Sequence, residues 1–398
     1  MKIIKFTLLV FGLILLKLIF FPIAAGSQDN PIIVGVLENR DYAYAAMMRR
    51  SFSLALESIN ARGGIGGRPL QLVYADDGGR KDQGVKAVKH LIYKNNAAIL
   101  TGAYSSSNTL AMTRTADELD IPFLVCTAAD DRITQHRRKN IFRLNPPASE
   151  YTRGLEQLIE SEVKPKTMAI VYENSPFGTG AATRMMWFCR EKKIEITDII
   201  PYHKERATAD YLDRIIAPLK QHAADVIFMA SYFKDGVLLV KRIRTAGINS
   251  RLFGGAGGFT HPKFIEASGD AAKHMLTATL WSADVGHQLA GYYVSHYRTR
   301  YGHIPDYHGA EAYSALLVVA DALRRAASTA PGEIRNALNQ TRLDTPFGRV
   351  AFESYATFER QNKQSTLVLQ NINNQYVCVW PPDLSTLKIT GNDSRPKD

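Results

Sequence analysis

Hydroxyl side chains follow two apolar, strand-like runs of the chain. The serines 105–107 come directly after the run Ala97–Gly102 and open a segment with helical spacing, and Thr127 ends the run Ile121–Thr127. Free N–H groups at a helix start, together with hydroxyl donors, favour an anionic or acceptor-rich group. Ligands of open α/β sheets bind beyond the carboxyl ends of strands. The two segments therefore predict a binding crevice, and an ordinary helix cap is the alternative explanation for each.

Two further segments of the same kind lie in the second half of the chain. Tyr172–Gly178 and Ser231–Phe233 each follow an apolar run and carry aromatic side chains. Either segment alone is also compatible with a turn that has an aromatic ring packed over it. Together with the serines they predict a pocket with both hydroxyl groups and aromatic walls.

Sequence motifs of enzymes are missing. No G-x-S-x-G, H-E-x-x-H or G-x-x-x-x-G-K-[ST] pattern occurs, and the cluster Gly254–Gly258 does not complete G-x-G-x-x-G. His303 and His308 flank Pro305, which predicts a loop rather than a metal site. An exported esterase that uses Ser105 or Ser106 would need a base, and no histidine has a recognisable partner motif. We therefore expect binding without catalysis, and neither a cofactor nor a metal.

Strand-like and helix-like segments alternate along most of the chain. The first half predicts strands at Ile32–Leu37, Leu70–Ala75, Ala97–Thr101 and Ile121–Thr127, separated by helices at Ala45–Asn60, Asp82–Lys94 and Asn108–Leu119. The pattern restarts with a predicted helix at Glu150–Glu162 and continues to Phe253. Such alternation predicts parallel βαβ units with right-handed crossovers. The fold class is therefore α/β, with two doubly wound parallel-sheet lobes.

The N-terminus has the layout of a secretory signal peptide. A short basic region precedes the apolar run Phe6–Leu16, and small residues follow at Ala24–Gly26. We expect residues 1–26 to be removed on export, with an uncleaved membrane anchor as the alternative. The net charge falls from +11 to +8 without the three lysines of this segment. The basic residues are scattered rather than striped, so no nucleic-acid partner is predicted.

Three cysteines stand far apart in the sequence. Cys126 and Cys378 lie within strand-like runs, which predicts small buried side chains. Cys189 has no C-x-x-C partner. The sequence allows at most one disulfide and does not select a pair.

These segments together resemble the leucine/isoleucine/valine-binding proteins, which are type I periplasmic receptors of ABC importers. The resemblance lies in Ile59–Leu70, Tyr74–Asp77 and the serine triplet, and extends in order from Pro31 to Trp380. It implies the type I periplasmic-binding fold, a three-segment hinge, a small-molecule ligand, permease subunits as partners, and a monomer in the periplasm. It places the hinge near Asn145–Ala148, Thr277–Ser282 and Gly348–Glu353. Residues 27–146 and 282–349 then form lobe 1, 147–281 and 350–382 form lobe 2, and 383–398 form a polar tail.

The resemblance also implies the residues of the site. The serine after the third strand, which holds the ligand α-carboxylate, corresponds to Ser105. An aromatic wall corresponds to Tyr44, a small-residue loop to Thr127–Ala129, and the aromatics of the second lobe to Phe177 and to Tyr232 or Phe233. The full set of predicted ligand-binding residues is Tyr44, Tyr104, Ser105, Ser106, Thr127, Ala128, Ala129, Phe177, Tyr232 and Ala256.

The chain departs from the family pattern where an amino acid's ammonium would bind. The family's acidic residue is expected after Phe253, where this chain has Gly254–Gly257, and Ala129 replaces a threonine. Burying an ammonium without an anion is costly. We therefore expect a small carboxylate or neutral compound with an apolar or aromatic body. A branched-chain or other amino acid, with Glu173 or Asp130 as the substitute acid, and a sensor for a membrane partner are the alternatives.

Overall fold

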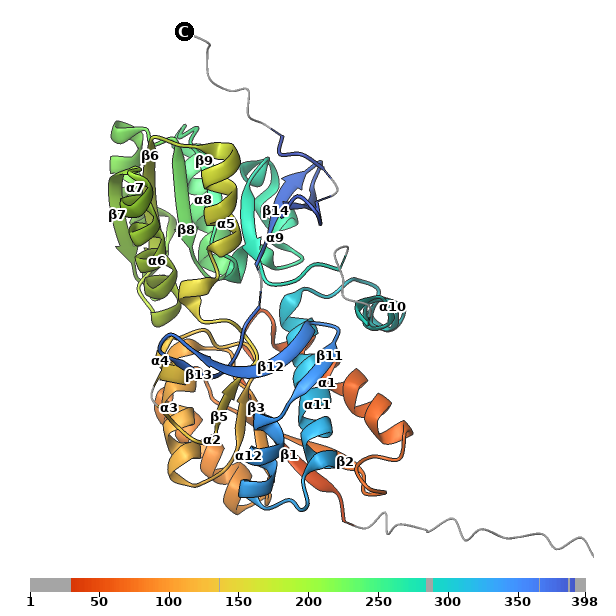
Figure 1. The fold of residues 1–398 in the computed structure, drawn as a ribbon. Helices are drawn as coiled ribbons and strands as arrows, with labels where there is room; N and C mark the ends of the chain where they lie inside the picture. Colours follow the sequence, from red (N-terminus) through yellow and green to blue (C-terminus); the bar gives the residue numbers. More distant parts are fainter. Residues whose placement is uncertain (1–29, 136, 284–288, 365, 386, 391–398) are drawn as a thin grey trace, which may run out of the picture.

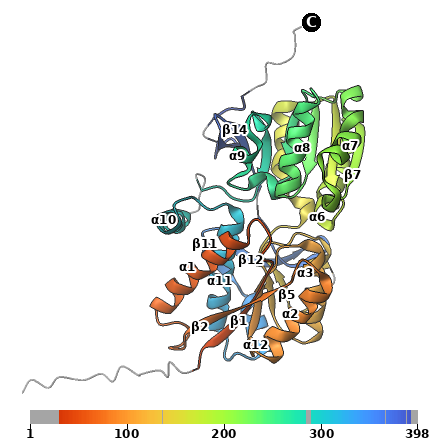
Figure 2. The ribbon, with the colours of Figure 1, turned by 180° about the vertical axis from the view of Figure 1, so that it is seen from behind.

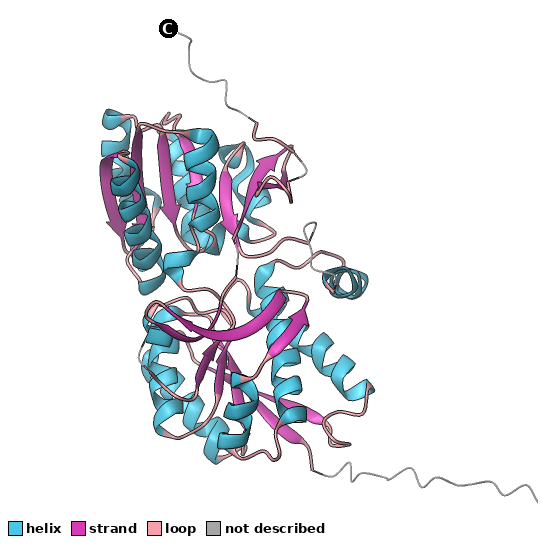
Figure 3. Cartoon of the chain, in the orientation of Figure 1, coloured by secondary structure: helices cyan, strands magenta, loops and turns pink. Residues whose placement is uncertain are grey.

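The computed structural model describes residues 30–135, 137–283, 289–364, 366–385 and 387–390, and these form two α/β lobes (Figure 1). Each lobe is a sheet covered by helices, as the cyan helices and magenta strands of Figure 3 show. Most strands of both sheets are parallel. The predicted fold class is confirmed.

The first lobe is built on an eight-stranded sheet of order β11-β12-β13-β5-β4-β3-β1-β2. Parallel pairing runs from β13 to β2, and β11, β12 and β13 pair antiparallel. The central strands are apolar and buried on both faces, as parallel sheets require. The strands are β1 (Ile32–Glu38), β2 (Leu70–Asp76), β3 (Ile99–Gly102), β4 (Phe123–Val125), β5 (Ile141–Arg143), β11 (Arg342–Thr345), β12 (Gly348–Tyr355) and β13 (Phe358–Asn362).

Helices cover both faces of the first sheet because its strands alternate their side chains between two cores. Val34 and Val36 pack with α1 and α11 in one core, whereas Leu37 and Leu100 pack with α2 and α3 in the other. Helix α11 is buried along most of its length, which its apolar run Ala315–Ala320 helps to explain. The helices are α1 (Ala45–Ala61), α2 (Lys81–Tyr93), α3 (Ser106–Glu118), α4 (Arg132–Gln135), α10 (Ala290–Tyr301), α11 (Tyr307–Arg325) and α12 (Pro331–Asn339).

The second lobe is built on a seven-stranded sheet of order β15-β14-β10-β9-β8-β6-β7. Strands β6 to β10 are parallel, and β14 and β15 close the edge antiparallel. Figure 2 shows α7 and α8 from the side opposite to Figure 1. The strands are β6 (Thr167–Glu173), β7 (Glu195–Tyr202), β8 (Val226–Ala230), β9 (Arg251–Gly254), β10 (Leu276–Thr279), β14 (Leu367–Ile372) and β15 (Gln375–Trp380).

Two separate cores flank this sheet as well. Met168 and Ile170 pack with α5 and α6, whereas Ala169 and Val171 pack with α7 and α8. The helices are η1 (Ala148–Glu150), α5 (Arg153–Leu158), η2 (Ile159–Val163), α6 (Pro176–Lys192), η3 (Lys204–Arg206), α7 (Ala209–His222), α8 (Phe233–Thr245), η4 (Gly257–Thr260), α9 (Phe264–Ser268) and η5 (Gly269–Ala272).

The chain passes between the lobes three times, and one passage differs from the prediction. The first lies between β5 and α5, and the second between β10 and α10. The third was predicted at Gly348–Glu353, but those residues form β12 of the first sheet, and the chain crosses only after β13. Lobe 1 therefore extends to Asn362 instead of 349, and the second-lobe segment begins later than 350. The polar strand Phe358–Asn362 has no apolar pattern that would predict it.

Buried amides hold the first and third passages together. Gln361 Nε2 donates to Asn145 O at 2.8 Å, and Asn362 Nδ2 donates to Leu144 O at 3.0 Å. Arg143 Nε donates to Gln361 Oε1 at 2.6 Å. Burial lowers the pKa of the Arg143 guanidinium to about 10. These bonds place two segments more than 200 residues apart side by side.

Several smaller predictions also differ from the structure. The single helix predicted at Glu150–Glu162 is divided into η1, α5 and η2, and β5 was not predicted. His308 was predicted in a loop and instead lies in the first turn of α11. Cys126 and Cys378 are buried, as predicted. The predicted signal peptide, residues 1–26, lies outside the described residues, and no helix within them is long and apolar enough to cross a membrane.

Candidate functional site

A small cavity lies where strand ends of the two sheets face each other. Its empty volume is about 260 Å³, and both lobes contribute to its walls. It lies beyond the carboxyl ends of β3, β4, β6 and β8, the place where α/β sheets bind ligands. The residues that line it are Tyr104, Ser106, Thr127, Ala129, Tyr151, Phe177, Tyr232, Gly257, Tyr307 and His308.

Aromatic rings from both lobes form most of the wall. Tyr104 follows β3 of the first lobe, and its ring centroid lies 5.9 Å from that of Tyr232, which caps α8 in the second. Phe177, in the first turn of α6, lies 5.5 Å from Tyr232 and 5.8 Å from Tyr151. Such rings favour flat or apolar bodies.

Tyr44 joins the two lobes across the cleft. Its hydroxyl, at the N-terminus of α1, donates to Gly257 O of the second lobe at 2.7 Å, and its ring lies 4.9 Å from His261. Gly257 has a φ of +60°, and a Cβ there would lie 2.7 Å from the Phe177 ring. Only glycine therefore fits at this contact.

The hydroxyl groups beside the cavity differ in what they can donate. Thr127 Oγ1 donates to Ala103 O at 2.9 Å, so its proton already holds the loop. Ser106 Oγ accepts from Ala129 N at 3.2 Å, which leaves its own proton available for a ligand oxygen. Ser105 is the N-cap residue of α3 and lies 3.4 Å, Oγ to Oγ, from Ser107. It does not line the cavity.

The predicted residues are therefore divided between the cavity and its surroundings. Tyr104, Ser106, Thr127, Ala129, Phe177 and Tyr232 line it, whereas Tyr44, Ser105, Ala128 and Ala256 are buried nearby without lining it. Phe233, the alternative to Tyr232, packs 4.1 Å from the His261 ring instead. Tyr151, Gly257, Tyr307 and His308 line the cavity and were not predicted. An aspartate before an apolar helical run, at Asp306, was the available signal for the start of α11.

His308 is the one residue among those lining the cavity whose side chain ordinarily ionises near neutral pH. Its side chain is 2% exposed, and Nδ1 lies 3.0 Å from Asp306 Oδ2. The ring is stacked on Tyr44 at 3.6 Å and on Tyr307 at 3.9 Å. No carboxylate is among the residues that line the cavity.

The two acids that we considered as ammonium partners lie close by but outside the wall. Asp130 forms an ion pair with Arg132 at 2.7 Å. Glu173 accepts from Ser175 Oγ and from Gly178 N through Oε1, while Oε2 is buried without a partner. Burial raises the pKa of Glu173 to about 7.

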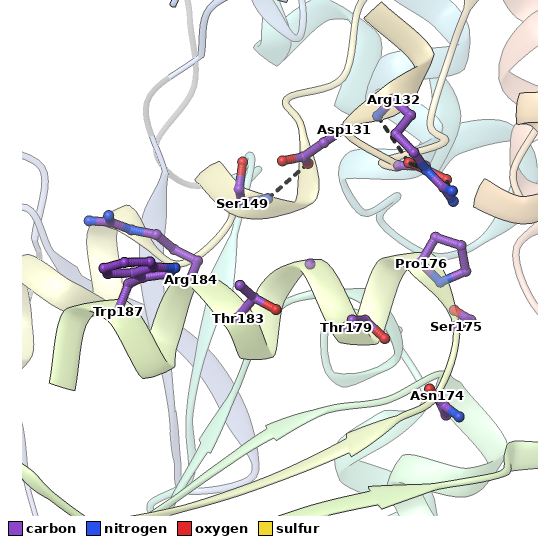
Figure 4. A pocket seen from close by; sticks show the side chains of 12 residues that line it. Asp131, Arg132, Ser149, Asn174, Ser175, Pro176, Thr179, Thr183, Arg184 and Trp187 are labelled. Carbon is purple, nitrogen blue, oxygen red and sulfur yellow. Dashed lines mark hydrogen bonds and ion pairs between the residues drawn. The ribbon is translucent and has the colours of Figure 1, made fainter. Parts of the chain in front are cut away.

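A second, open groove runs beside the cleft. It lies between the loop 130–132 and η1 of the hinge region on one side and the first turns of α6 on the other (Figure 4). Its residues include Arg184 and the exposed Trp187. Ser149 N donates to Asp131 Oδ1 at 3.2 Å, and this bond joins η1 to the loop 130–132. No residue is shared with the aromatic cavity.

The structure also brings a serine and a histidine to one cavity, with an aspartate beside the histidine. Ser106 and His308 both line it, and His308 is bonded to Asp306. A serine nucleophile needs its base within hydrogen-bond reach. Among the described residues no hydrogen bond joins Ser106 to His308. Within the described residues, no group of three or more histidine, cysteine, aspartate or glutamate side chains could hold a metal ion.

Curated relatives cover most of the chain at low identity. A Leu/Ile/Val-binding protein homolog 7 of Brucella suis is 24% identical over 353 residues, covering 83% of this chain and 86% of the relative. A homolog 8 of Brucella abortus is 25% identical over 361 residues, with 85% and 87% covered.

Solved structures show the same fold. The branched-chain amino acid transporter substrate-binding protein LivJ from Streptococcus pneumoniae, in complex with isoleucine, aligns with a TM-score of 0.78 at 21% identity, covering 87% of this chain and 98% of that one. A solute-binding protein from R. palustris, in complex with benzoate, aligns with a TM-score of 0.76 at 19% identity, covering 88% and 96%. Both of these proteins are described as substrate- or solute-binding proteins of transporters.

The family comparison covers nearly the whole described chain. The periplasmic binding protein model matches residues 31–373, which include the first sheet, all of the second sheet except β15, and all three passages between the lobes. The chain therefore belongs to the periplasmic binding protein family, as the sequence predicted, and has the fold of the solute-binding proteins of ABC transporters.

Proposed function

We propose that the chain is an exported receptor that binds a small carboxylate with an apolar or aromatic body and delivers it to the permease of an ABC importer. The observation that carries the proposal is the cavity itself, which has aromatic walls from both lobes, one histidine and no lining acid. The benzoate-bound relative supports it, because benzoate has a carboxylate and no ammonium.

Each lobe supplies part of the site, so the ligand stabilises the closed state by contacting both. Tyr104, Ser106 and His308 belong to the first lobe, and Phe177, Tyr232 and Gly257 to the second. Ser106 Oγ is the hydroxyl that we assign to the ligand carboxylate. The three passages act as the hinge, and the protein binds as a monomer without converting its ligand.

A thermal-shift screen with mass spectrometry of the recovered ligand tests this proposal. Benzoate, phenylacetate, 3-phenylpropanoate and 4-methylpentanoate are compared with amino acids and amides. A ligand at 100 times its Kd adds about 2.7 kcal/mol to the folded state, or roughly 5–10 °C in Tm. The proposal predicts a shift with at least one acid and recovery of that acid unchanged. Absence of any shift with the acids, or chemical conversion, contradicts it.

A branched-chain amino acid receptor is the second candidate. The observation in its favour is the buried Oε2 of Glu173, which has no partner. Glu173 lies at the carboxyl end of β6, and burial, together with the nearby Glu173 carboxyl, raises the pKa of the cavity-lining Tyr232 phenol. An amino acid ligand would then depend on Glu173, and E173Q would abolish its binding.

If the receptor serves a sensor rather than an importer, its gene should lack permease and ATPase neighbours.

A further inference from the structure

His308 is presented to the cavity by the start of α11. Asp306 is the N-cap residue of this helix, and its Oδ1 accepts from His308 N at 3.0 Å. Its Oδ2 lies 3.0 Å from His308 Nδ1. One carboxylate therefore fixes both the backbone and the ring of His308, and the ring cannot turn without breaking the second bond.

The second nitrogen of the ring is left for a ligand. Asp306 engages Nδ1, and within the described residues no hydrogen bond to Nε2 is found. Since Nδ1 and Nε2 lie on opposite edges of an imidazole, a ring held through Nδ1 directs Nε2 away from Asp306. The ring lines the cavity and its side chain is 2% exposed.

Aromatic rings and one carboxylate surround the imidazole of His308. Tyr44 and Tyr307 are stacked on it with interplanar angles of 24°, and aromatic faces attract a cation. Tyr104 is a third ring, at 5.5 Å. Asp306 Oδ2 faces Nδ1 at 3.0 Å, and because a carboxylate oxygen accepts, Nδ1–H is the donor of this bond.

Other ionisable side chains lie near this site. The His261 ring of the second lobe also packs against Tyr44, with ring centroids 4.9 Å apart, and burial lowers its pKa, which favours the neutral imidazole. Glu311, one turn along α11 from Tyr307, is fully buried, and burial raises its pKa well above the ordinary value, which favours the neutral acid. Lys204 Nζ lies 4.1 Å from the centroid of the Tyr232 ring without lining the cavity, so the basic side chain in the cavity wall is that of His308.

Resting on the proposed function, we infer that His308 is the cationic partner of the ligand carboxylate, with Asp306 as its positioning residue. Nε2–H donates to one carboxylate oxygen, and Ser106 Oγ–H donates within the same cavity. The ligand class is thereby narrowed to anions with one carboxylate and no ammonium. Neutral amides of the same shape lack the charge and bind more weakly.

The test compares an acid with its own primary amide by calorimetry. The pairs are benzoate with benzamide and 4-methylpentanoate with 4-methylpentanamide. In H308N the side-chain amide still reaches Asp306 but no group replaces Nε2. Charged hydrogen bonds contribute about 1.5–3 kcal/mol, so the acid should bind roughly 10- to 150-fold more weakly. The amide should change less than threefold, and D306N should weaken acid binding while leaving the amide unchanged.

A matched control and a second measurement separate the outcomes. H303N changes an exposed histidine ahead of the same helix and should leave both affinities unchanged. If H308N keeps the preference for acid over amide, the assignment of His308 is wrong and the proposed function stands. If no acid binds the wild type while it melts cooperatively, the proposed function and this inference are both wrong.

Ring nitrogen NMR of the wild type does not depend on a folded variant. With benzoate bound, both nitrogens of one buried histidine should show the chemical shifts of the imidazolium. A His308 ring that stays singly protonated in the complex contradicts the inference.

Discussion

The bond between Tyr44 and Gly257 should contribute to ligand affinity because it joins the two lobes. Tyr44 Oη donates to Gly257 O at 2.7 Å, and both groups are buried. In Y44F this bond is lost, yet Gly257 O still accepts from Thr260 Oγ1 at 3.0 Å. The acceptor is not left unsatisfied, so the cost is that of an ordinary hydrogen bond, about 0.5–1.5 kcal/mol. Loss of this bond should destabilise the closed form and leave the open form unaffected.

Calorimetry with the best acid of the screen measures the effect. The Kd of Y44F should rise roughly 2- to 13-fold, while the melting temperature without ligand should change little if the free protein is mainly open. Y293F is the matched control, since Tyr293 Oη lies 2.8 Å from Ser51 Oγ and both groups belong to the first lobe. It should lower the melting temperature and leave the Kd unchanged. Equal affinities of Y44F and the wild type, or an equal loss in Y293F, would refute the role of this bond.

Three further predictions concern the acid beside the cavity, the serines and the hinge. Glu173 has a pKa of about 7 in the folded protein against an ordinary 4.5, so its stabilising contribution is complete below about pH 4.5 and is lost as pH rises through 7. E173Q should remove this pH-dependent loss in the free energy of unfolding, which is at most about 3 kcal/mol. Denaturant titrations at several pH values measure it. S106A should weaken acid binding by about 0.5–3 kcal/mol in calorimetry, whereas S105A should leave the affinity nearly unchanged, because the Ser105 side chain neither lines the cavity nor makes a helix-cap hydrogen bond. Q361A should destabilise the protein by about 1–3 kcal/mol in denaturant titrations, because it leaves buried partners of the hinge without hydrogen bonds.

Each of these has an outcome that would contradict it. If the free energy of unfolding varies with pH in the same way for E173Q and the wild type between pH 4.5 and 8, burial does not raise the pKa of the Glu173 carboxyl. A larger affinity loss in S105A than in S106A would return the ligand contact to Ser105. Unchanged stability of Q361A, with Q364A as the control on the same segment, would exclude a structural role for the amide bonds of the hinge.

The fold was predictable because its core strands are short apolar runs between amphipathic helices. Val226–Ala230, for example, is buried at every position, as a central parallel strand should be. The third passage was mispredicted because β13 is polar: Gln361 and Asn362 are buried and bonded to backbone oxygens of a segment far away in the sequence. Such a strand is stabilised by tertiary hydrogen bonds, which no local pattern reveals.

The site was partly predictable for a similar reason. Ser106, Thr127 and Phe177 follow strands directly, so strand ends alone place them at the cavity. Tyr307 and His308 belong to a helix that returns to the first lobe after the second passage. Their approach to the cavity depends on how the chain crosses between lobes, which the spacing of residues does not encode.

The central claim is that the cavity accepts a carboxylate and excludes an ammonium. Titration of the purified protein with 4-methylpentanoate and with leucine tests it most directly, because the two ligands differ only in the α-ammonium group. The account predicts that 4-methylpentanoate binds at least about tenfold more tightly, since a buried ammonium without an anion costs more than 1.4 kcal/mol. Tighter binding of leucine would contradict it and would show that an acid such as Glu173 reaches the ligand.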